Sequence, residues 1–219
     1  MRRLIILARI SRVRQRITRS FMAEETHFDR AVIDDILARL HPVAGRPFVV
    51  AIDGPGGSGK STLARELAAA YDGLAAVVEG DYFYADLDDD YRAGLDAKDG
   101  YREYFDWQRL RDQVFVPARQ GRPIKYRRYD WGNARMGDWL TVPGVELLLV
   151  EGVYSSRPEL REYADLVLWV TTSEEERVRR QFERRQNQGV WIKRWMAAED
   201  YYLDNIHQPG SAEVVVLGE

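Results

Sequence analysis

The sequence predicts one α/β domain, a three-layer sandwich with a five-stranded parallel sheet. Short, continuous apolar runs indicate the strands, because parallel strands buried on both faces lack the alternation of half-exposed ones. Segments with helical spacing separate the runs, and a glycine-rich stretch follows the first of them. The chain of 219 residues, 45% of them hydrophobic, is large enough for a single core of this kind. The runs are 48–52, 75–78, 145–150, 166–170 and 214–217.

Residues 1–20 contain seven arginines and no acidic residue. A like-charged stretch with little apolar periodicity is typical of a solvated tail, so we interpret 1–21 as a basic, disordered extension of a domain spanning 22–219. The alternative is a basic arm that touches a membrane or a nucleic acid. The apolar stretch 4–8 is too short to span a bilayer, and the rest of the chain has 25 basic and 35 acidic residues. The sequence therefore predicts no membrane span and no nucleic-acid partner.

Deleting residues 1–21 is expected to leave activity and thermal stability nearly unchanged, because this stretch can bury little apolar surface. The turnover and melting temperature of the truncated and full-length proteins, measured side by side, test this expectation. A fall in melting temperature of more than about 4 °C, roughly 1–2 kcal/mol for a chain of this size, would instead show that the extension docks on the domain.

Residues 26–40 show helical spacing of apolar residues and end before Pro42, which predicts a helix that packs on the sheet.

The chain contains no cysteine, which excludes disulfides, thiol nucleophiles and cysteine-ligated metals. Its three histidines lack the spacing of a zinc site. The lack of cysteine is consistent with a cytoplasmic enzyme. The sequence leaves the oligomeric state open and is compatible with a homo-oligomer.

The glycine-rich stretch fits G-x-x-x-x-G-K-[ST], the phosphate-binding P-loop, in its required place between a strand and a helix. Its glycines let successive N–H groups converge on phosphate oxygens at a helix N-terminus. Lys60 would supply a cation for the β- and γ-phosphates, Ser61 would place its hydroxyl on Mg²⁺, and Thr62 can satisfy backbone groups of the first helical turn. The sequence therefore predicts a bound nucleotide with Mg²⁺. The residues assigned to the nucleotide are Gly54, Gly56, Gly57, Ser58, Gly59, Lys60, Ser61 and Thr62.

An aspartate, Asp81, follows the second strand, and the carboxyl edge of a parallel sheet is where open α/β folds bind ligands. The next segment, about 82–140, is rich in acids and aromatic residues and shows no clean periodicity, so we interpret it as an acceptor-site insertion. Within it, 124–131 mixes cations with flat rings. These residues form either one side of an acceptor pocket or an amphipathic surface hairpin.

The strand at 145–150 ends in Glu151, which matches the position of a Mg²⁺-binding carboxylate after a central strand. Ser156 with Glu159, and Ser173 with Glu176, have the spacing of capping boxes and each predict the start of a helix. On the second helix Val178 and Phe182 are expected to point inward. The stripe Arg177, Arg180 and Arg184 is expected to clamp phosphate rather than form a solvated face, within a lid at about 174–195.

In this order, the motifs resemble those of the uridine kinase and phosphoribulokinase group of P-loop kinases. The resemblance spans roughly 46–218 and implies a P-loop NTPase fold of the nucleoside and nucleotide kinase type, with ATP and Mg²⁺ as cofactors. The motifs are the P-loop preceded by Asp53, the Asp-x-Phe-Tyr element Asp81–Tyr84, Phe105–Trp107, Glu151–Tyr154 and the arginines of 177–185.

The same resemblance assigns roles to individual residues. Asp81 is implied as the general base on the acceptor hydroxyl and, with Ser61 and Glu151, as a Mg²⁺ contact. Catalytic contacts to phosphate are implied for Lys60, Arg180 and Arg184, and acceptor contacts for Asp106, Tyr84, Tyr126 and Trp131. One departure is that no histidine lies between 41 and 207, whereas the uridine–cytidine kinases read the pyrimidine with one. Trp131 lies near that place.

The resulting hypothesis is an ATP-dependent kinase that phosphorylates a hydroxyl of a small molecule, with uridine or another nucleoside as first choice. The alternative acceptors are a sugar, a sugar phosphate or a pantothenate-like alcohol. A different class of function, a nucleotide-dependent switch or binding module, is disfavoured because the chain has no Asn-Lys-x-Asp element to read guanine.

Overall fold

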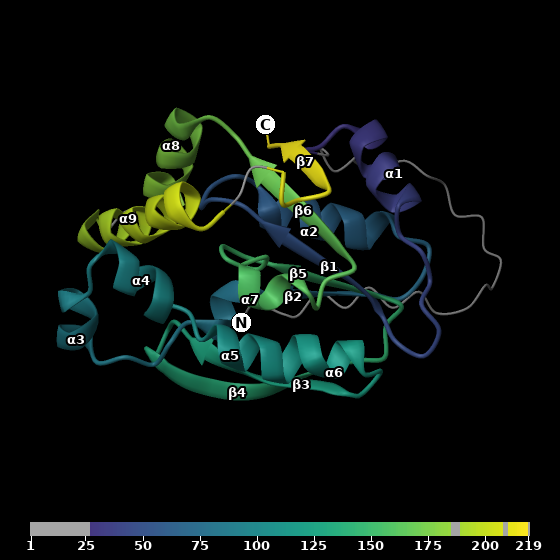
Figure 1. Ribbon diagram of the computed structural model, residues 1–219, viewed down its shortest axis with the longest axis horizontal. Coiled ribbons are helices and arrows are strands. Elements are labelled where there is room, and N and C mark those ends of the chain that lie inside the picture. Colours follow the sequence, from purple (N-terminus) through teal and green to yellow (C-terminus); the bar gives the residue numbers. More distant parts are fainter. Residues whose placement is uncertain (1–26, 185–188, 208–209, 219) are drawn as a thin grey trace, which may run out of the picture.

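The computed structural model describes residues 27–184, 189–207 and 210–218, so the predicted basic extension at 1–21 lies outside the described residues. The core is a five-stranded parallel sheet with the order β2-β5-β1-β6-β7 (Figure 1). This arrangement confirms the predicted sheet. The strands are β1 (Phe48–Asp53), β2 (Ala75–Glu79), β5 (Leu147–Glu151), β6 (Leu166–Thr171) and β7 (Val214–Leu217).

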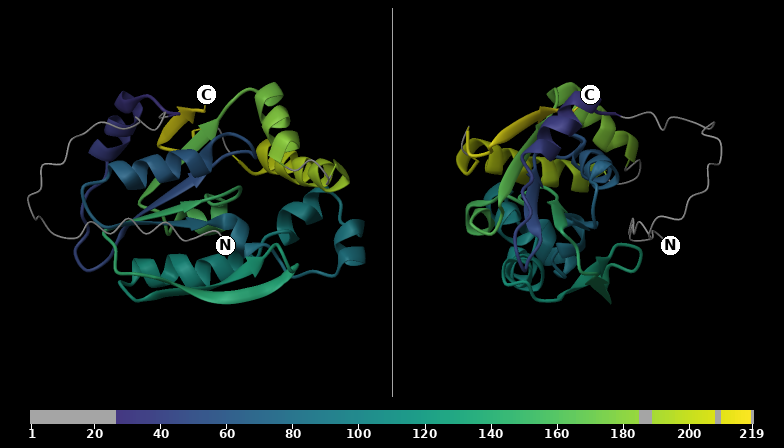
Figure 2. Two further views of the ribbon diagram at one scale, coloured as in Figure 1. Left: turned by 180° about the vertical axis from the view of Figure 1, so that it is seen from behind. Right: turned by 90° about the vertical axis from the view of Figure 1, so that its right-hand side faces the viewer.

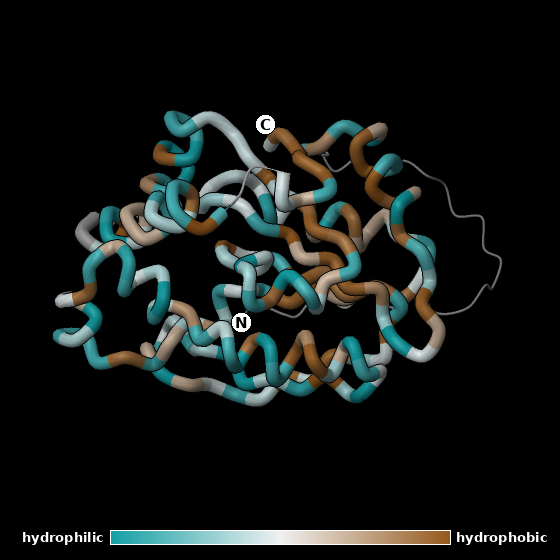
Figure 3. The backbone as a smooth tube through the Cα atoms, viewed as in Figure 1, coloured by the Kyte–Doolittle hydropathy of each residue, from teal (hydrophilic) through white to brown (hydrophobic). Residues whose placement is uncertain are grey.

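Helices cover both faces of the sheet, because successive side chains of each strand point to opposite sides. Val50 and Ile52 of β1 pack in one cluster with α1 (Arg30–Ala38) and α2 (Lys60–Ala70). Val49 and Ala51 pack in the other. The second face is covered by α5 (Trp107–Leu110), the π-helical segment Arg111–Phe115, α6 (Val116–Arg119) and α7 (Pro158–Arg161). Figures 2 and 3 show this sandwich, with apolar residues gathered along the central strands.

The predicted insertion at 82–140 contains more regular structure than its sequence suggested. Residues 124–131 belong to an antiparallel hairpin of β3 (Ile124–Asp130) and β4 (Arg135–Val142), whose inner residues join the second core cluster. Before the hairpin, the acid-rich stretch folds into the 3₁₀ turn η1 (Gly80–Phe83), α3 (Asp89–Gly94) and α4 (Ala97–Glu103). Asp88 and Asp96 accept backbone hydrogen bonds at the starts of α3 and α4, which accounts for part of the acidic composition.

Two further helices, α8 (Glu174–Arg184) and α9 (Gly189–Asn205), lie beyond one end of the sheet, where α9 packs along α4 (Figure 1). The described parts of the predicted lid, 174–184 and 189–195, lie within these two helices. The expectation that Phe182 points inward is wrong, since its side chain is 42% exposed whereas Arg177 is 9% exposed. The helix turns its polar stripe toward the P-loop because partners for the arginines lie there.

The two predicted capping boxes have different outcomes. The Ser173 hydroxyl accepts a hydrogen bond from the Glu176 N–H at 3.3 Å, as predicted. Ser156 does not cap α7, whose N-cap residue is Arg157, because its hydroxyl donates instead to Asp53. No helix within the described ranges is both long and apolar enough to cross a membrane.

Candidate functional site

The P-loop connects β1 to α2 with the curled backbone that phosphate binding requires. Gly57 has a φ of +81°, and a side chain there would bring its Cβ to 2.8 Å from the carbonyl oxygen of Arg177. Lys60 is 7% exposed, and its Nζ donates to the Pro55 carbonyl at 2.8 Å. The buried Ser58 hydroxyl has no hydrogen-bond partner among the described residues. The loop, its cation and this unsatisfied hydroxyl fit a phosphate chain.

Asp53, the residue before the P-loop, organises the backbone beneath it. Its Oδ1 accepts from the N–H groups of Gly54 (2.6 Å) and Tyr154 (2.9 Å). Its Oδ2 accepts from the Ser156 N–H (2.9 Å), the Ser156 hydroxyl (2.7 Å) and the Tyr202 hydroxyl (2.9 Å). A fully buried carboxylate with this many donors joins β1, the loop after β5 and α9.

Replacing Asp53 with asparagine is expected to lower the free energy of unfolding by about 2–3 kcal/mol, because an amide nitrogen would face groups that already donate. Urea denaturation measures the change in midpoint. Tyr202→Phe removes one donor and is the milder control, with an expected loss of about 1 kcal/mol. An Asp53→Asn protein with the wild-type midpoint would contradict this account of the carboxylate.

Two carboxylates, Asp81 and Glu151, meet Ser61 and Lys60 in one cavity at the carboxyl edge of the sheet. The register of the parallel strands brings these residues together. Glu151 of β5 lies opposite Ile52 of β1, and Asp81 follows the end of β2, which pairs with β5. Burial, and next the charge of Asp81, raise the pKa of Glu151 to about 7 against the opposing effect of Lys60. Two carboxylates and a hydroxyl supply the hard oxygen ligands that Mg²⁺ prefers. A small number of protein ligands suits this ion, because it keeps several of its own waters.

Aromatic side chains also line this cavity. Trp131 and Trp195 lie edge to face with ring centroids 5.8 Å apart. The Trp131 Nε1–H donates to the Asp81 carbonyl at 3.1 Å. This hydrogen bond connects the hairpin loop to the segment that follows β2. The remaining aromatic lining residues are Tyr104, Phe105 and Tyr154.

Three residues with implied acceptor contacts are not among those that line the cavity, and their acceptor roles stay predictions. Asp106 caps α5, accepting from the Arg109 N–H at 2.9 Å and pairing with its guanidinium at 3.2 Å. Tyr126 has no exposed surface and packs on Phe83 with ring centroids 5.3 Å apart. Tyr84 is 2% exposed and lies behind Trp131, 4.5 Å away between ring centroids. Both tyrosines are therefore buried, and Tyr84 packs directly on the cavity residue Trp131.

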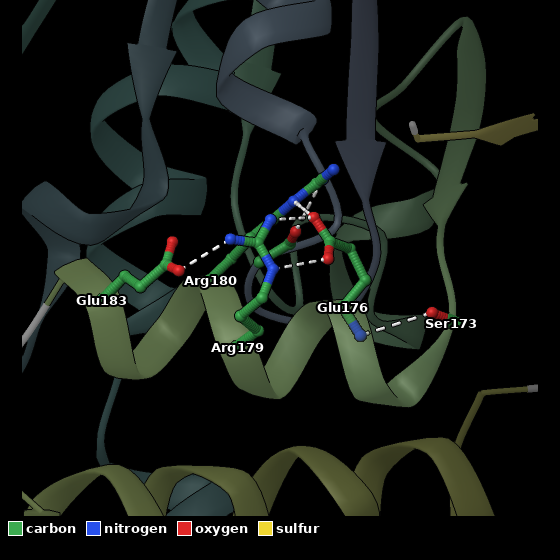
Figure 4. Close-up of polar contacts among 6 residues, drawn as sticks. Ser173, Glu176, Arg179, Arg180 and Glu183 are labelled. Carbon is green, nitrogen blue, oxygen red and sulfur yellow. Dashed lines mark hydrogen bonds and ion pairs between the residues drawn. The ribbon is translucent and has the colours of Figure 1, made fainter.

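The lid helix α8 places an ion-pair network beside the P-loop (Figure 4). Glu176 pairs with both Arg179 and Arg180, and hydrogen bonds from Arg179 and then Arg180 lower its pKa to about 2. Arg180 also donates from Nη1 to the Gly57 carbonyl at 3.3 Å. Arg180 therefore contacts the P-loop, and its role as a phosphate contact stays a prediction. The side chain of Arg184 is outside the described part of the chain.

Several cavity residues were missed by sequence reasoning, notably Gln181 and Glu199. Trp195, Glu199 and Tyr202 recur at intervals of four and three along α9, and all three contact the site or its supports. That spacing is a detectable signal, because such positions share one helix face. It became meaningful only once α9 was known to lie over the P-loop.

Sequence comparison relates the chain to kinases. The chain is 28% identical over 140 residues to a uridine kinase of Halobacterium salinarum, a match covering 63% of this chain and 62% of that relative. A solved structure of a possible uridine kinase from Bacillus stearothermophilus superposes with a TM-score of 0.67 at 24% identity, covering 85% of this chain and 98% of the other.

A second solved structure shares the fold, and its protein is named for a different acceptor. Phosphoribulokinase from Rhodobacter spheroides superposes with a TM-score of 0.54 at 19% identity, covering 74% of this chain and 66% of that one. At these identities the structural matches establish the fold alone. The sequence profile of the phosphoribulokinase and uridine kinase family matches residues 49–190. The P-loop, the acidic edge and this match together show that the chain belongs to the phosphoribulokinase / uridine kinase family.

Proposed function

We propose that this protein is an ATP- and Mg²⁺-dependent kinase that transfers the γ-phosphoryl group to a hydroxyl of a small molecule. The observation that carries the proposal is the composition of one cavity. Lys60 and Ser61 of the P-loop, the carboxylates Asp81 and Glu151, and an aromatic wall all line it. The phosphate-binding end and a pocket for an organic acceptor therefore adjoin each other.

Each group has a role that its position supports. The P-loop amides and Lys60 hold the phosphate chain, and Arg180 approaches it from the lid. Asp81 is exposed in the cavity, where its carboxylate can accept the proton of the acceptor hydroxyl as the oxygen attacks phosphorus. Ser61 and Glu151 are the residues that would hold Mg²⁺, which would neutralise charge on the phosphates. Catalysis would consist mainly of positioning and charge stabilisation.

The preferred acceptor is uridine or another nucleoside. The names of the sequence relatives and the flat rings of Trp131, Trp195 and Phe105 favour a molecule with a planar face. A sugar, a sugar phosphate or a pantothenate-like alcohol is the alternative, since family members differ in the acceptor they are named for.

A screen of acceptor-dependent ADP release over nucleosides, sugars and their phosphates tests the proposal. We expect one chemical class to raise ADP release at least tenfold above the rate without acceptor. A nucleotide-dependent switch would hydrolyse ATP at a rate that no small acceptor changes. That result, across the full panel, would overturn the kinase assignment.

A further inference from the structure

Three side chains of the lid helices hold the P-loop tip, which we define as Gly56 and Gly57. The Gly56 N–H donates to Oε2 of Glu199 on α9 at 2.9 Å. Nε2 of Gln181 on α8 donates to the Gly56 carbonyl at 3.0 Å, and Arg180 donates to that of Gly57. Both polar backbone groups of Gly56 are therefore fixed by residues more than a hundred positions away in the sequence.

The fit around Gly56 is close. A Cβ added to this residue would lie 2.8 Å from Nε2 of Gln181 and 2.9 Å from Oε1 of Glu199. Any side chain at this position would displace both contacts. The glycine therefore permits the lid side chains to reach the loop backbone directly.

Glu199 is presented by a helix whose position is fixed independently. Ala198 of α9 is 1% exposed and joins a cluster with Tyr84 and Tyr104. One turn further on, Tyr202 donates to Oδ2 of Asp53, the residue before the P-loop. The same helix face therefore contacts the loop at its start and at its tip, so a small displacement of α9 would move the tip.

The carboxylate of Glu199 is 8% exposed, and such burial requires compensation. Burial raises its pKa, while the charge of Lys60, the Gly56 hydrogen bond and the charge of Arg177 lower it. The negative charge of Asp200 raises the pKa of Glu199, as burial does. The pKa stays raised, so two cations and one backbone donor compensate only in part for the burial of this acid beside the loop.

We propose that Glu199 is a positioning residue that fixes the P-loop tip, so that the γ-phosphoryl group is held in line with the acceptor. The inference rests on the proposed kinase function. Reacting groups tolerate little displacement, because a shift of about 1 Å can cost roughly 10²-fold in rate. The amides nearer α2 cradle the inner phosphates, so losing the Glu199 contact should affect turnover far more than ADP affinity.

The kinetic test compares variants that separate the hydrogen bond from the charge. Glu199→Ala is expected to lower kcat by about 10- to 100-fold, with the Kd for ADP within about threefold of wild type. Glu199→Gln should keep kcat within about threefold, since its amide oxygen accepts the same bond. Glu199→Asp keeps the charge but is one methylene shorter, and should lose turnover as the alanine variant does. Asp204→Ala, an exposed acid on the same helix, is the matched control and should behave as wild type.

Amide hydrogen exchange of the loop provides a readout that needs no activity. Exchange at Gly56 should accelerate at least tenfold in Glu199→Ala and stay near wild type in Glu199→Gln. If no acceptor supports ADP release by the wild-type protein, the proposed function fails, and exchange alone still decides whether Glu199 fixes the tip. Unchanged exchange in the alanine variant would overturn the inference.

The kinetic results can also overturn the positioning role proposed for Glu199. Normal kcat in a folded Glu199→Ala protein would remove the positioning role, and a glutamine variant as slow as the alanine variant would assign the effect to charge. If the alanine variant unfolds, Glu199→Asp and Glu199→Gln carry the comparison, and equal activity in those two would contradict the proposal.

Discussion

Replacing Lys60 with alanine is expected to reduce phosphoryl transfer by about 10³-fold or more while leaving the fold intact. The lysine acts as a point charge for the β- and γ-phosphates: its side chain lines the cavity and its Nζ donates to the Pro55 carbonyl, and it belongs to none of the apolar core clusters of the described residues. Losing that one hydrogen bond should cost about 1 kcal/mol, a few degrees in melting temperature.

Turnover and melting temperature of the Lys60→Ala protein, measured on one preparation, separate the two effects. Lys125→Ala on the exposed side of the hairpin removes the same charge away from the cavity and should leave turnover unchanged. Wild-type turnover in Lys60→Ala would remove the P-loop from the mechanism. Loss of folding would show that the lysine is a structural element.

Asp81→Asn is expected to lower kcat by roughly 10²- to 10⁴-fold, as for a lost general base, and largely to spare ATP affinity. The side chain is exposed in the cavity, so the isosteric amide should not disturb the core. The measurement is kcat, the Kd for ATP and melting temperature on the same protein, with the exposed Asp86→Asn as the charge-matched control.

Two other outcomes would reassign Asp81. Near-normal kcat in a well-folded Asp81→Asn protein would end its assignment as the base. A large loss of ATP affinity would move it to the metal site with Ser61 and Glu151, which line the same cavity.

The sheet and the P-loop could be predicted because each depends on local sequence. Apolar runs specify buried parallel strands, and a glycine pattern between a strand and a helix specifies the loop. Glu151 was also predictable, since a carboxylate that ends a central strand lies at the ligand-binding edge. The structure places it there, in the cavity with Ser61.

The direction of side chains in the insertion and the lid could not be predicted, because it depends on distant partners. Phe182 was expected inside and lies outside, since Arg180 of the same helix finds its acceptor on the P-loop. Tyr126 was expected to contact the acceptor, yet tertiary packing buries it on the inner face of the hairpin, against Phe83. Glu199 contacts a residue 143 positions away, which no local pattern encodes.

The most direct test of the kinase assignment is the balance of products in a single reaction followed by phosphorus NMR. With ATP, Mg²⁺ and the acceptor found by the screen, the account predicts one phosphorylated acceptor for each ADP formed. Little inorganic phosphate should appear, and ADP formation should stop when the acceptor is exhausted. ADP and inorganic phosphate formed in equal amounts, at a rate that the acceptor does not alter, would contradict it.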